Sequence, residues 1–254
     1  MMPVRLKGIL LPLLLVTNLA QAAAELQIMG PAGEQTVSLP EGARLADALL
    51  LPQVQPLGYR PCARISTPQL DQQLQAQKQA LLSRLDKLHY QFLADSQRPQ
   101  AMAVKQLKQQ LDSLVLHAAI RVSLDPDRLR IRKGENLRLE GSYRLYLPSC
   151  EPGLTLLGAV ANPGPQPLIA GQWLADYLND QQEQPWAESS WAWYLAGQDD
   201  AVRVGLDGWN RKHREASAGA VLFVGFDAGA LPAGYEDINQ AIVSLLQQGM
   251  GLQP

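Results

Sequence analysis

The chain has 254 residues, of which 46% are hydrophobic and 18% charged, and its 22 basic and 24 acidic side chains give a net charge of −2. This composition is typical of a globular protein and excludes disordered, collagen-like and polytopic membrane proteins. The slight excess of acidic groups also argues against a nucleic-acid-binding protein, which needs a basic surface.

The N-terminus has the pattern of a secretory signal peptide. Residues 1–7 carry two positive charges, residues 8–16 form a short apolar run, and Ala20-Gln21-Ala22 provides a small-residue cleavage site. The run is too short for a comfortable membrane span, although a retained N-terminal anchor is the alternative. We therefore assign residues 1–24 to a signal peptide and expect an exported, soluble product.

Cys62 and Cys150 are the only cysteines, and the chain has three histidines. A four-cysteine zinc site is therefore impossible, and we expect no metal and no other cofactor. In an oxidising compartment the two thiols are able to pair, closing a loop of roughly 90 residues. The alternative is two partly buried cysteines that never meet, because a disulfide requires Cα atoms within about 7 Å of each other.

The first structural unit begins after the signal peptide. Short β-type runs at residues 26–29 and 35–39, separated by a Gly-Pro turn, predict a hairpin, and residues 45–49 predict a short helix. Further strands of this unit are predicted at residues 120–124, 128–131 and 143–147.

A second unit repeats this order. A hairpin is predicted around the Asn-Pro-Gly-Pro turn, and the helix after it repeats the Leu-Ala-Asp-x-Leu pattern of residues 45–49. The predicted elements are a hairpin of residues 154–160 and 167–170, a helix at 174–178, and strands at 191–195, 201–204 and 220–224. Each unit is therefore predicted to form a small mixed sheet crossed by one helix.

Residues 68–117 differ in character, because they are rich in glutamine and contain no glycine. Apolar residues recur at helical spacing over residues 74–92 and again over residues 104–114, which predicts two amphipathic helices. Residues 95–99 break the pattern, so we expect an antiparallel helical hairpin inserted in the first unit. Its apolar stripes are expected to face each other, and docking of a partner is the alternative.

The last segment, residues 235–248, is predicted to be an amphipathic helix with Ile238, Ile242, Leu245 and Leu246 on one face. We expect this helix to pack on the protein's own sheet. The alternative is membrane contact, in which such helices from several subunits insert together.

Several stretches of the chain resemble a known family. The sequence Leu-Gly-Ala-Val-Ala-Asn-Pro-Gly at residues 157–164 is similar to the opening of the β-grasp modules of polysaccharide export proteins. The C-terminal signature of the GfcC family of capsule-biosynthesis proteins resembles residues 209–213, 218–226, 231–232 and 235–246, and other parts of that family resemble residues 124–127 and 139–148. The resemblance covers nearly the whole mature chain.

The resemblance implies an α+β fold of two tandem β-grasp domains. The first domain, residues 25–150, is interrupted by the helical hairpin at about 68–117, and the second comprises residues 151–230. Residues 231–254 hold the C-terminal amphipathic helix and a tail. Such domains are similar to the SLBB-like β-grasp domains of the outer-membrane polysaccharide export protein Wza, whose C-terminal helices form a pore.

The function implied by this resemblance is that of a non-catalytic periplasmic accessory protein in capsule or exopolysaccharide assembly or export. Its expected partners are a polysaccharide, outer-membrane polysaccharide export proteins, or both. The leading hypothesis is binding through a groove, in which Arg121 is the best match to an arginine of the family near the end of the helical insertion. The competing hypothesis is an assembly protein that docks on the export machinery through its C-terminal helix and hairpin.

Aromatic and basic side chains provide further candidates for ligand binding. Trp191 and Trp193 alternate, so both project from one side of a strand, where they either stack on sugar rings or form the core face of the second sheet. Trp186 lies in a predicted loop and is expected to be freer to stack. Arg211 and Arg214 belong to a basic run that either grips an anionic polysaccharide or is a solvated turn.

Motifs of common enzyme families are absent from the sequence. It contains no nucleophile elbow, no His-Glu-x-x-His zinc motif, no P-loop and no dinucleotide glycine pattern. Acid pairs occur at Asp125 and Asp127 and at Asp199 and Asp200, but they coincide with turn signals, where aspartate is common for local hydrogen bonding. We therefore expect no enzyme, and a polysaccharide-modifying hydrolase remains a remote alternative.

Overall fold

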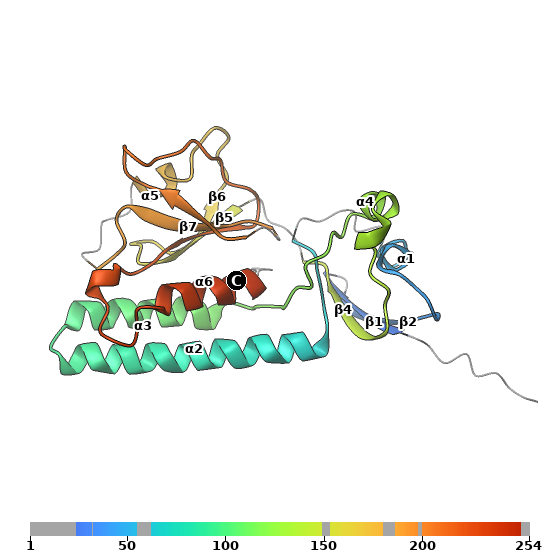
Figure 1. The fold of residues 1–254 in the computed structure, drawn as a ribbon, viewed down its shortest axis with the longest axis horizontal. Coiled ribbons are helices and arrows are strands. Elements are labelled where there is room, and N and C mark those ends of the chain that lie inside the picture. Colours follow the sequence, from blue (N-terminus) through green and yellow to red (C-terminus); the bar gives the residue numbers. More distant parts are fainter. Residues whose placement is uncertain are drawn as a thin grey trace, which may run out of the picture.

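The computed structural model of the chain describes residues 24–31, 33–54, 62–148, 153–179, 186–197 and 200–249. Within this part the fold is α+β, with a four-stranded sheet, a five-stranded sheet and long helices (Figure 1). The predicted fold class is confirmed. The predicted signal peptide lies outside the described residues, apart from Ala24.

The first sheet has the strand order β2-β1-β4-β3. Its central strands β1 and β4 are parallel, and the two flanking pairs are antiparallel. The short helices α1 and α4 share an apolar core with one face of the sheet, to which Leu26, Ile28 and Leu145 contribute. The bounds are β1 Ala24–Gly30, β2 Gly33–Leu39, β3 Arg64–Ser66, β4 Gly141–Tyr146, α1 Leu45–Leu49 and α4 Pro126–Ile131.

The second sheet has the order β6-β5-β9-β7-β8, with β5 and β9 parallel in its centre. A hairpin followed by a helix and by a later strand that pairs in parallel with the first one is the β-grasp arrangement, which both sheets share. The bounds are β5 Gly153–Gly158, β6 Gly164–Pro167, β7 Trp191–Leu195, β8 Val202–Gly205, β9 Ala220–Val224 and α5 Asp176–Asn179. All five residues of β9 are buried, because both faces of this sheet are covered.

The predicted helical hairpin is confirmed as α2 (Pro68–Ala94) and α3 (Arg98–Ser113). The helix α2 starts at Thr67, whose hydroxyl accepts a hydrogen bond from the Leu70 amide, and Pro68 occupies the first turn, where its missing N–H costs nothing. The chain reverses at Ser96, which has a left-handed φ of 61°. The C-terminal helix α6 spans Ile238–Gly249.

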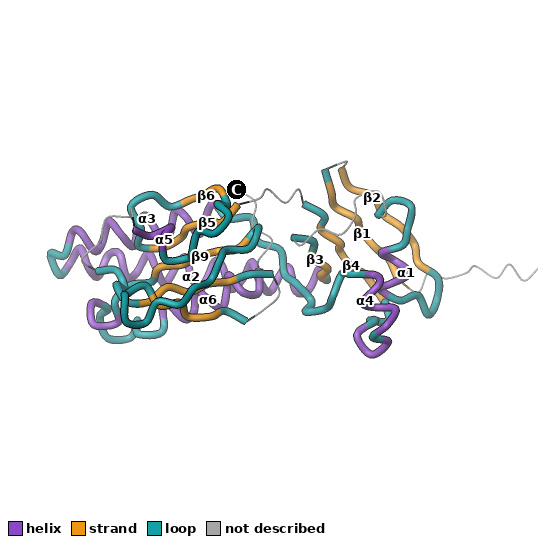
Figure 2. Tube along the Cα trace, turned by 90° about the horizontal axis from the view of Figure 1, so that it is seen from above, coloured by secondary structure: helices purple, strands orange, loops and turns teal. Residues whose placement is uncertain are grey.

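In space the hairpin belongs to the second sheet. The helices α2 and α3 pack on each other and, together with α6, cover the face of that sheet that carries Leu157, Leu195 and Phe223 (Figures 1 and 2). We expected the apolar stripes only to face each other, because helical spacing does not reveal which sheet also covers them. In the sequence the hairpin is inserted within the first domain, but in space it packs on the sheet of the second domain.

The helix α6 packs on its own chain, as expected. Ile238, Ile242 and Leu246 are fully buried in the core that it shares with α2. Just before the helix, the carboxylate of Asp237 accepts two hydrogen bonds from the Arg84 guanidinium, at 2.6 and 3.0 Å. Among the described helices, none has the length and apolar character needed to cross a membrane.

Three predicted elements of the fold are wrong. Residues 128–131 form the helix α4 instead of a strand, because Asp125 caps the amides of Asp127 and Arg128 and Pro126 fits the first turn. Residues 120–124 belong to no strand, although the Ile120 amide donates to the carbonyl of Ile65. The second strand of the second hairpin, β6, starts at Gly164 instead of residue 167.

Candidate functional site

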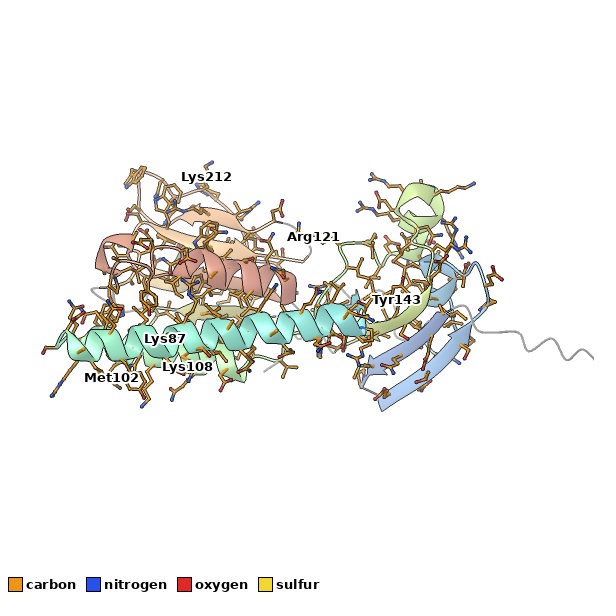
Figure 3. All side chains as sticks on the ribbon, turned by 60° about the horizontal axis from the view of Figure 1, so that its bottom comes forward. Lys87, Met102, Lys108, Arg121, Tyr143 and Lys212 are labelled. Carbon is orange, nitrogen blue, oxygen red and sulfur yellow. The ribbon has the colours of Figure 1, made fainter. Side chains whose placement is uncertain are left out.

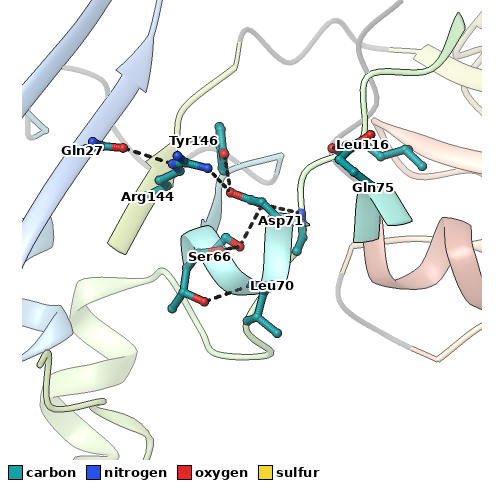
Figure 4. Close-up of polar contacts among 10 residues, drawn as sticks. Gln27, Ser66, Leu70, Asp71, Gln75, Leu116, Arg144 and Tyr146 are labelled. Carbon is teal, nitrogen blue, oxygen red and sulfur yellow. Dashed lines mark hydrogen bonds and ion pairs between the residues drawn. The ribbon is translucent and has the colours of Figure 1, made fainter. Parts of the chain in front are cut away.

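A buried carboxylate joins the first sheet to the start of α2 (Figure 4). Asp71, which is only 9% exposed, accepts hydrogen bonds from the Ser66 hydroxyl at 3.0 Å and from the Ala118 amide at 3.1 Å. Its second oxygen accepts from Arg144 at 3.0 Å and from the Tyr146 hydroxyl at 2.8 Å. Four donors from three segments of the chain therefore hold the helical hairpin against the first sheet, which makes this cluster structural.

An aromatic pair lies beside Asp71. The ring of His117 stacks on Tyr146 with centroids 3.8 Å apart. Burial lowers the pKa of His117, and burial together with the hydrogen bond to Asp71 raises the pKa of Tyr146. Both shifts favour the neutral side chains, so the carboxylate and Arg144 are the charged groups of the cluster.

Arg121 lies where the chain leaves the hairpin, in the stretch between the two halves of the molecule (Figure 3). Its guanidinium donates to Asp200 at 2.8 Å, and the same carboxylate oxygen accepts from Gln247 of α6 at 2.9 Å. The Arg121 side chain is 56% exposed, so it is accessible as well as ion-paired. The arginine lowers the pKa of the exposed Asp200 by hydrogen bonding. Its predicted role in binding stays a prediction.

The basic run at residues 211–214 is divided between two roles. Arg211 is fixed, because its guanidinium donates to Asp176 at 3.3 Å and to Asn179 at 2.9 Å. Arg214 is exposed, and its guanidinium lies 5.4 Å from the ring centre of Tyr194. Of these two predicted ligand-binding residues, Arg211 is ion-paired with Asp176, whereas Arg214 is exposed and packs its guanidinium over the ring of Tyr194.

Trp186 is not the free stacking surface that we expected. Its ring is half-buried against the core formed by the helices, and its indole Nε1 is buried without a hydrogen-bond partner among the residues that the structure describes. Phe92, Phe226 and Leu231 line the small cavity beside it. Trp186 was predicted to be freer to stack because it lies in a predicted loop, but its ring packs against the apolar core of the helices.

The most exposed tryptophan is Trp209, at 76%. Its ring meets Trp191 edge-on, with centroids 6.1 Å apart, and its Nε1 donates to Asp207 at 3.2 Å. The Arg203 guanidinium lies 4.8 Å from the centre of the Trp191 ring and 5.8 Å from that of Trp193. Cation–π attraction at these distances holds Arg203 against Trp191, and the edge-on contact joins Trp209 to Trp191. We call Trp191, Arg203 and Trp209 the indole platform.

The indole platform was only partly predictable. Trp191 and Trp193 do project from one side of β7, where Leu195 faces the helical core and Trp193 is half-buried at its border. The sequence analysis missed Trp209 as a surface residue. The signal was the Asp-Gly-Trp-Asn turn around it, since turn residues lie at the surface and leave a large side chain uncovered.

Other predicted groups fall partly beyond the described residues. Cys62 is not a free thiol, but its predicted partner Cys150 lies outside the described part, so this pairing stays a prediction. Within the described ranges, no group of three or more His, Cys, Asp or Glu side chains is placed to hold a metal ion.

Comparison with known proteins places most of the chain in one family. The N-terminal model of the capsule biosynthesis GfcC family matches residues 22–149, and the C-terminal model matches residues 162–251. The uncharacterized protein YjbG of Escherichia coli K12 is 31% identical over 172 residues, which cover 68% of this chain and 69% of that protein. The chain therefore belongs to the capsule biosynthesis GfcC family.

Proposed function

We propose that this protein is a non-catalytic, exported accessory protein of capsule or exopolysaccharide assembly, and that it binds polysaccharide on the indole platform. Membership of the GfcC family supports the link to capsule biosynthesis. The signal-peptide pattern of residues 1–24 supports a periplasmic location in a Gram-negative cell.

The exposed face of Trp209 is the observation on which the binding proposal rests. Sugar rings have apolar C–H faces, and an indole that is already held in place offers such a face a large contact area at little entropic cost. Trp209 is held by Trp191 on one side and by Asp207 at its Nε1. The platform is therefore ordered before the ligand arrives.

Polar groups around the platform suit sugar hydroxyls. Arg203 supplies donors, and the carboxylate of Glu188 lies 3.9 Å from its guanidinium. Asp207 supplies a second acceptor beside Trp209. An aromatic surface bordered by a few convergent polar groups is the usual construction of a small-ligand site. With one positive and two negative charges, these groups favour an uncharged segment of the polymer.

Arg121, Arg211 and Arg214 take different places in this proposal. Arg121 and Arg211 are engaged by Asp200 and Asp176, so we assign them a role in holding the fold. Arg214 is a candidate for a second contact with the polymer. Trp186 is left out of the binding surface because its Nε1 is buried.

The test is binding of the mature protein to the extracellular polysaccharide of its own host, measured by calorimetry. Trp209→Ala is expected to weaken binding about 5- to 150-fold, since stacking of an aromatic ring contributes about 1–3 kcal/mol in comparable nucleic-acid contacts. Tyr90→Ala is the matched control, because Tyr90 is also an exposed aromatic residue, 67% exposed, on the helical hairpin. Equal binding by both variants and the wild type would refute the platform as the site.

A second candidate function is docking on a protein of the export machinery through the outer face of the hairpin. Tyr90 and Met102 are 67% and 59% exposed there, and Figure 3 labels Met102, Lys87 and Lys108 on the two helices that cover the second sheet. Exposed large apolar side chains among charges are typical of partner contacts. Tyr90→Ala combined with Met102→Ala is expected to abolish co-purification with outer-membrane proteins while leaving glycan binding intact.

A further inference from the structure

The two sheets of the protein have four edge strands, and three of them are blocked within the described chain. The strand β6 contains Pro165 and Pro167, which have no N–H to offer. The outer side of β3 is engaged by the amide of Ile120, which donates to Ile65 at 2.8 Å. The strand β8 is short, and its last residue, Gly205, is bridged by Arg211.

The fourth edge, β2, is long and open among the described residues. It pairs with β1 over seven consecutive residues without a bulge, and its other side forms the rim of the first sheet (Figure 2). Glu34, Gln35, Thr36 and Ser38 are exposed. The strand contains no proline, lysine or arginine, which are the residues that natural proteins use to prevent pairing at an edge.

From this contrast we infer that β2 pairs antiparallel with β2 of a second copy of the protein, so that two first sheets join into one continuous sheet across a two-fold axis. An antiparallel ladder between identical strands satisfies the two-fold symmetry of the commonest oligomers. It also provides partners for the backbone groups along the rim of the sheet.

The register of this pairing follows from length and charge. All seven residues of β2 find a partner only when the ladder is centred on Thr36, which then faces Thr36 of the second copy. Cross-strand threonine pairs are favourable. The single charge of the strand, Glu34, faces Ser38 in this register, so like charges do not meet. Self-pairing therefore encounters no electrostatic penalty along the ladder.

The predicted interface is small, because seven residues from each copy form it. The dimer is therefore expected to be concentration-dependent. Its test is analytical ultracentrifugation of the mature protein over a wide concentration range. Thr36→Lys places two lysines opposite each other and is expected to leave only monomer. Gln166→Lys, the same kind of change on the proline-blocked β6, is the matched control and is expected to dimerise as the wild type does.

A charge exchange tests the register itself. Thr36→Glu alone is expected to be monomeric, whereas an equimolar mixture of Thr36→Glu and Thr36→Lys is expected to restore the dimer through opposite charges. Circular dichroism checks that each variant is folded, and the restored mixture also excludes a folding defect as the cause of dissociation. A wild type that stays monomeric at the highest concentration would overturn the inference. So would a Thr36→Lys variant that dimerises normally, or a mixture that does not reassociate.

Discussion

The ammonium group of Lys78 on α2 donates a hydrogen bond to the carbonyl oxygen of Leu114, just beyond the end of α3, over 2.7 Å. A second bond of 2.8 Å reaches the carbonyl of Asp112. Lys78 is only 6% exposed. A buried cation thus occupies the C-terminal end of α3, where the helix leaves carbonyl groups without partners and its dipole favours positive charge.

Replacing this lysine is expected to destabilise the hairpin. Lys78→Met keeps the apolar length but leaves the buried carbonyl of Leu114 and the partly buried carbonyl of Asp112 without this donor, which should lower the free energy of unfolding by about 2 kcal/mol. Urea denaturation measures the change. Lys87→Met, at an exposed position of the same helix, is the control and should cost less than about 0.5 kcal/mol. Similar losses in both variants would contradict the capping role.

The buried His117 should make stability depend on pH. Burial lowers its pKa in the folded protein, despite the nearby Asp71, and Arg144 acts in the same direction as burial. The unfolded chain, with an ordinary histidine pKa of about 6.5, therefore binds a proton first as the pH falls. Above a pH of about 6.5 the histidine is neutral in both states and its contribution to stability is complete. As the pH falls below this value, the unfolded chain is protonated and the contribution is lost. The loss ends when the pH falls below the lowered pKa of His117 in the folded protein.

His117→Gln is expected to reduce this pH dependence. Urea denaturation of the wild type between pH 7.5 and pH 5 should show a steeper loss of stability than the variant, and the carboxylates with lowered pKa values, such as Asp200, contribute mainly at lower pH. Parallel curves for the two proteins would show that His117 does not titrate differently in the folded and unfolded states.

Gly158 at the end of β5 should tolerate no side chain. Its φ is +99°, and an added Cβ would collide with the carbonyl oxygen of Val224. Gly158→Ala combines backbone strain with overpacking and is expected to cost roughly 3 kcal/mol. Thermal unfolding measures the loss. Gly208→Ala serves as control, because its Cβ would meet no atom within 4 Å, and an equal loss there would contradict the argument.

The predicted bond between Cys62 and Cys150 is testable in the exported protein. A disulfide that closes a loop of roughly 90 residues should stabilise the fold by about 4 kcal/mol in the chain-entropy model. Mass spectrometry of the unreduced, digested protein should detect the two peptides linked to each other. Cys150→Ser should lower the midpoint of urea denaturation, whereas an unchanged midpoint under reducing and oxidising conditions would argue against the bond.

The position of signal cleavage is a further prediction. Ala24 is 2% exposed and is the first residue of β1, where it pairs with Leu39 on one side and Gly141 on the other. Cleavage after Ala22, at the Ala-Gln-Ala site, retains this residue, whereas cleavage after Ala24 removes it from the sheet. The intact mass of the exported protein should therefore correspond to a chain that starts at Ala23, which moves the end of the signal peptide from residue 24, as assigned from the sequence, to residue 22.

Local patterns predicted much of the fold, because many elements satisfy their preferences within a few residues. The spacing of Leu81, Leu85 and Leu88 predicted the long helix α2, and the alternation in β7 predicted that strand. The error at residues 128–131 arose from reading alternating arginines as a strand, although the Asp125-Pro126 pair just before them starts a helix.

The candidate sites were harder to predict because they depend on contacts between distant residues. Asp71 lies in the first turn of α2, ahead of the apolar pattern that predicted this helix, and its four donors come from segments up to 75 residues away. Arg203 and Trp191 meet because of the register between β7 and β8, which no local pattern defines. Chemistry of this kind requires the tertiary structure.

The placement of the hairpin also determines how the protein unfolds. A fragment that ends after the first domain would carry α2 and α3 with Leu85, Leu107 and their neighbours stripped of the second sheet and α6. A fragment that contains only the second domain would expose the apolar face of its sheet that α2 and α3 cover in the whole protein. Neither half is therefore expected to be a stable unit, and the two domains should melt in a single cooperative transition despite their separate sheets.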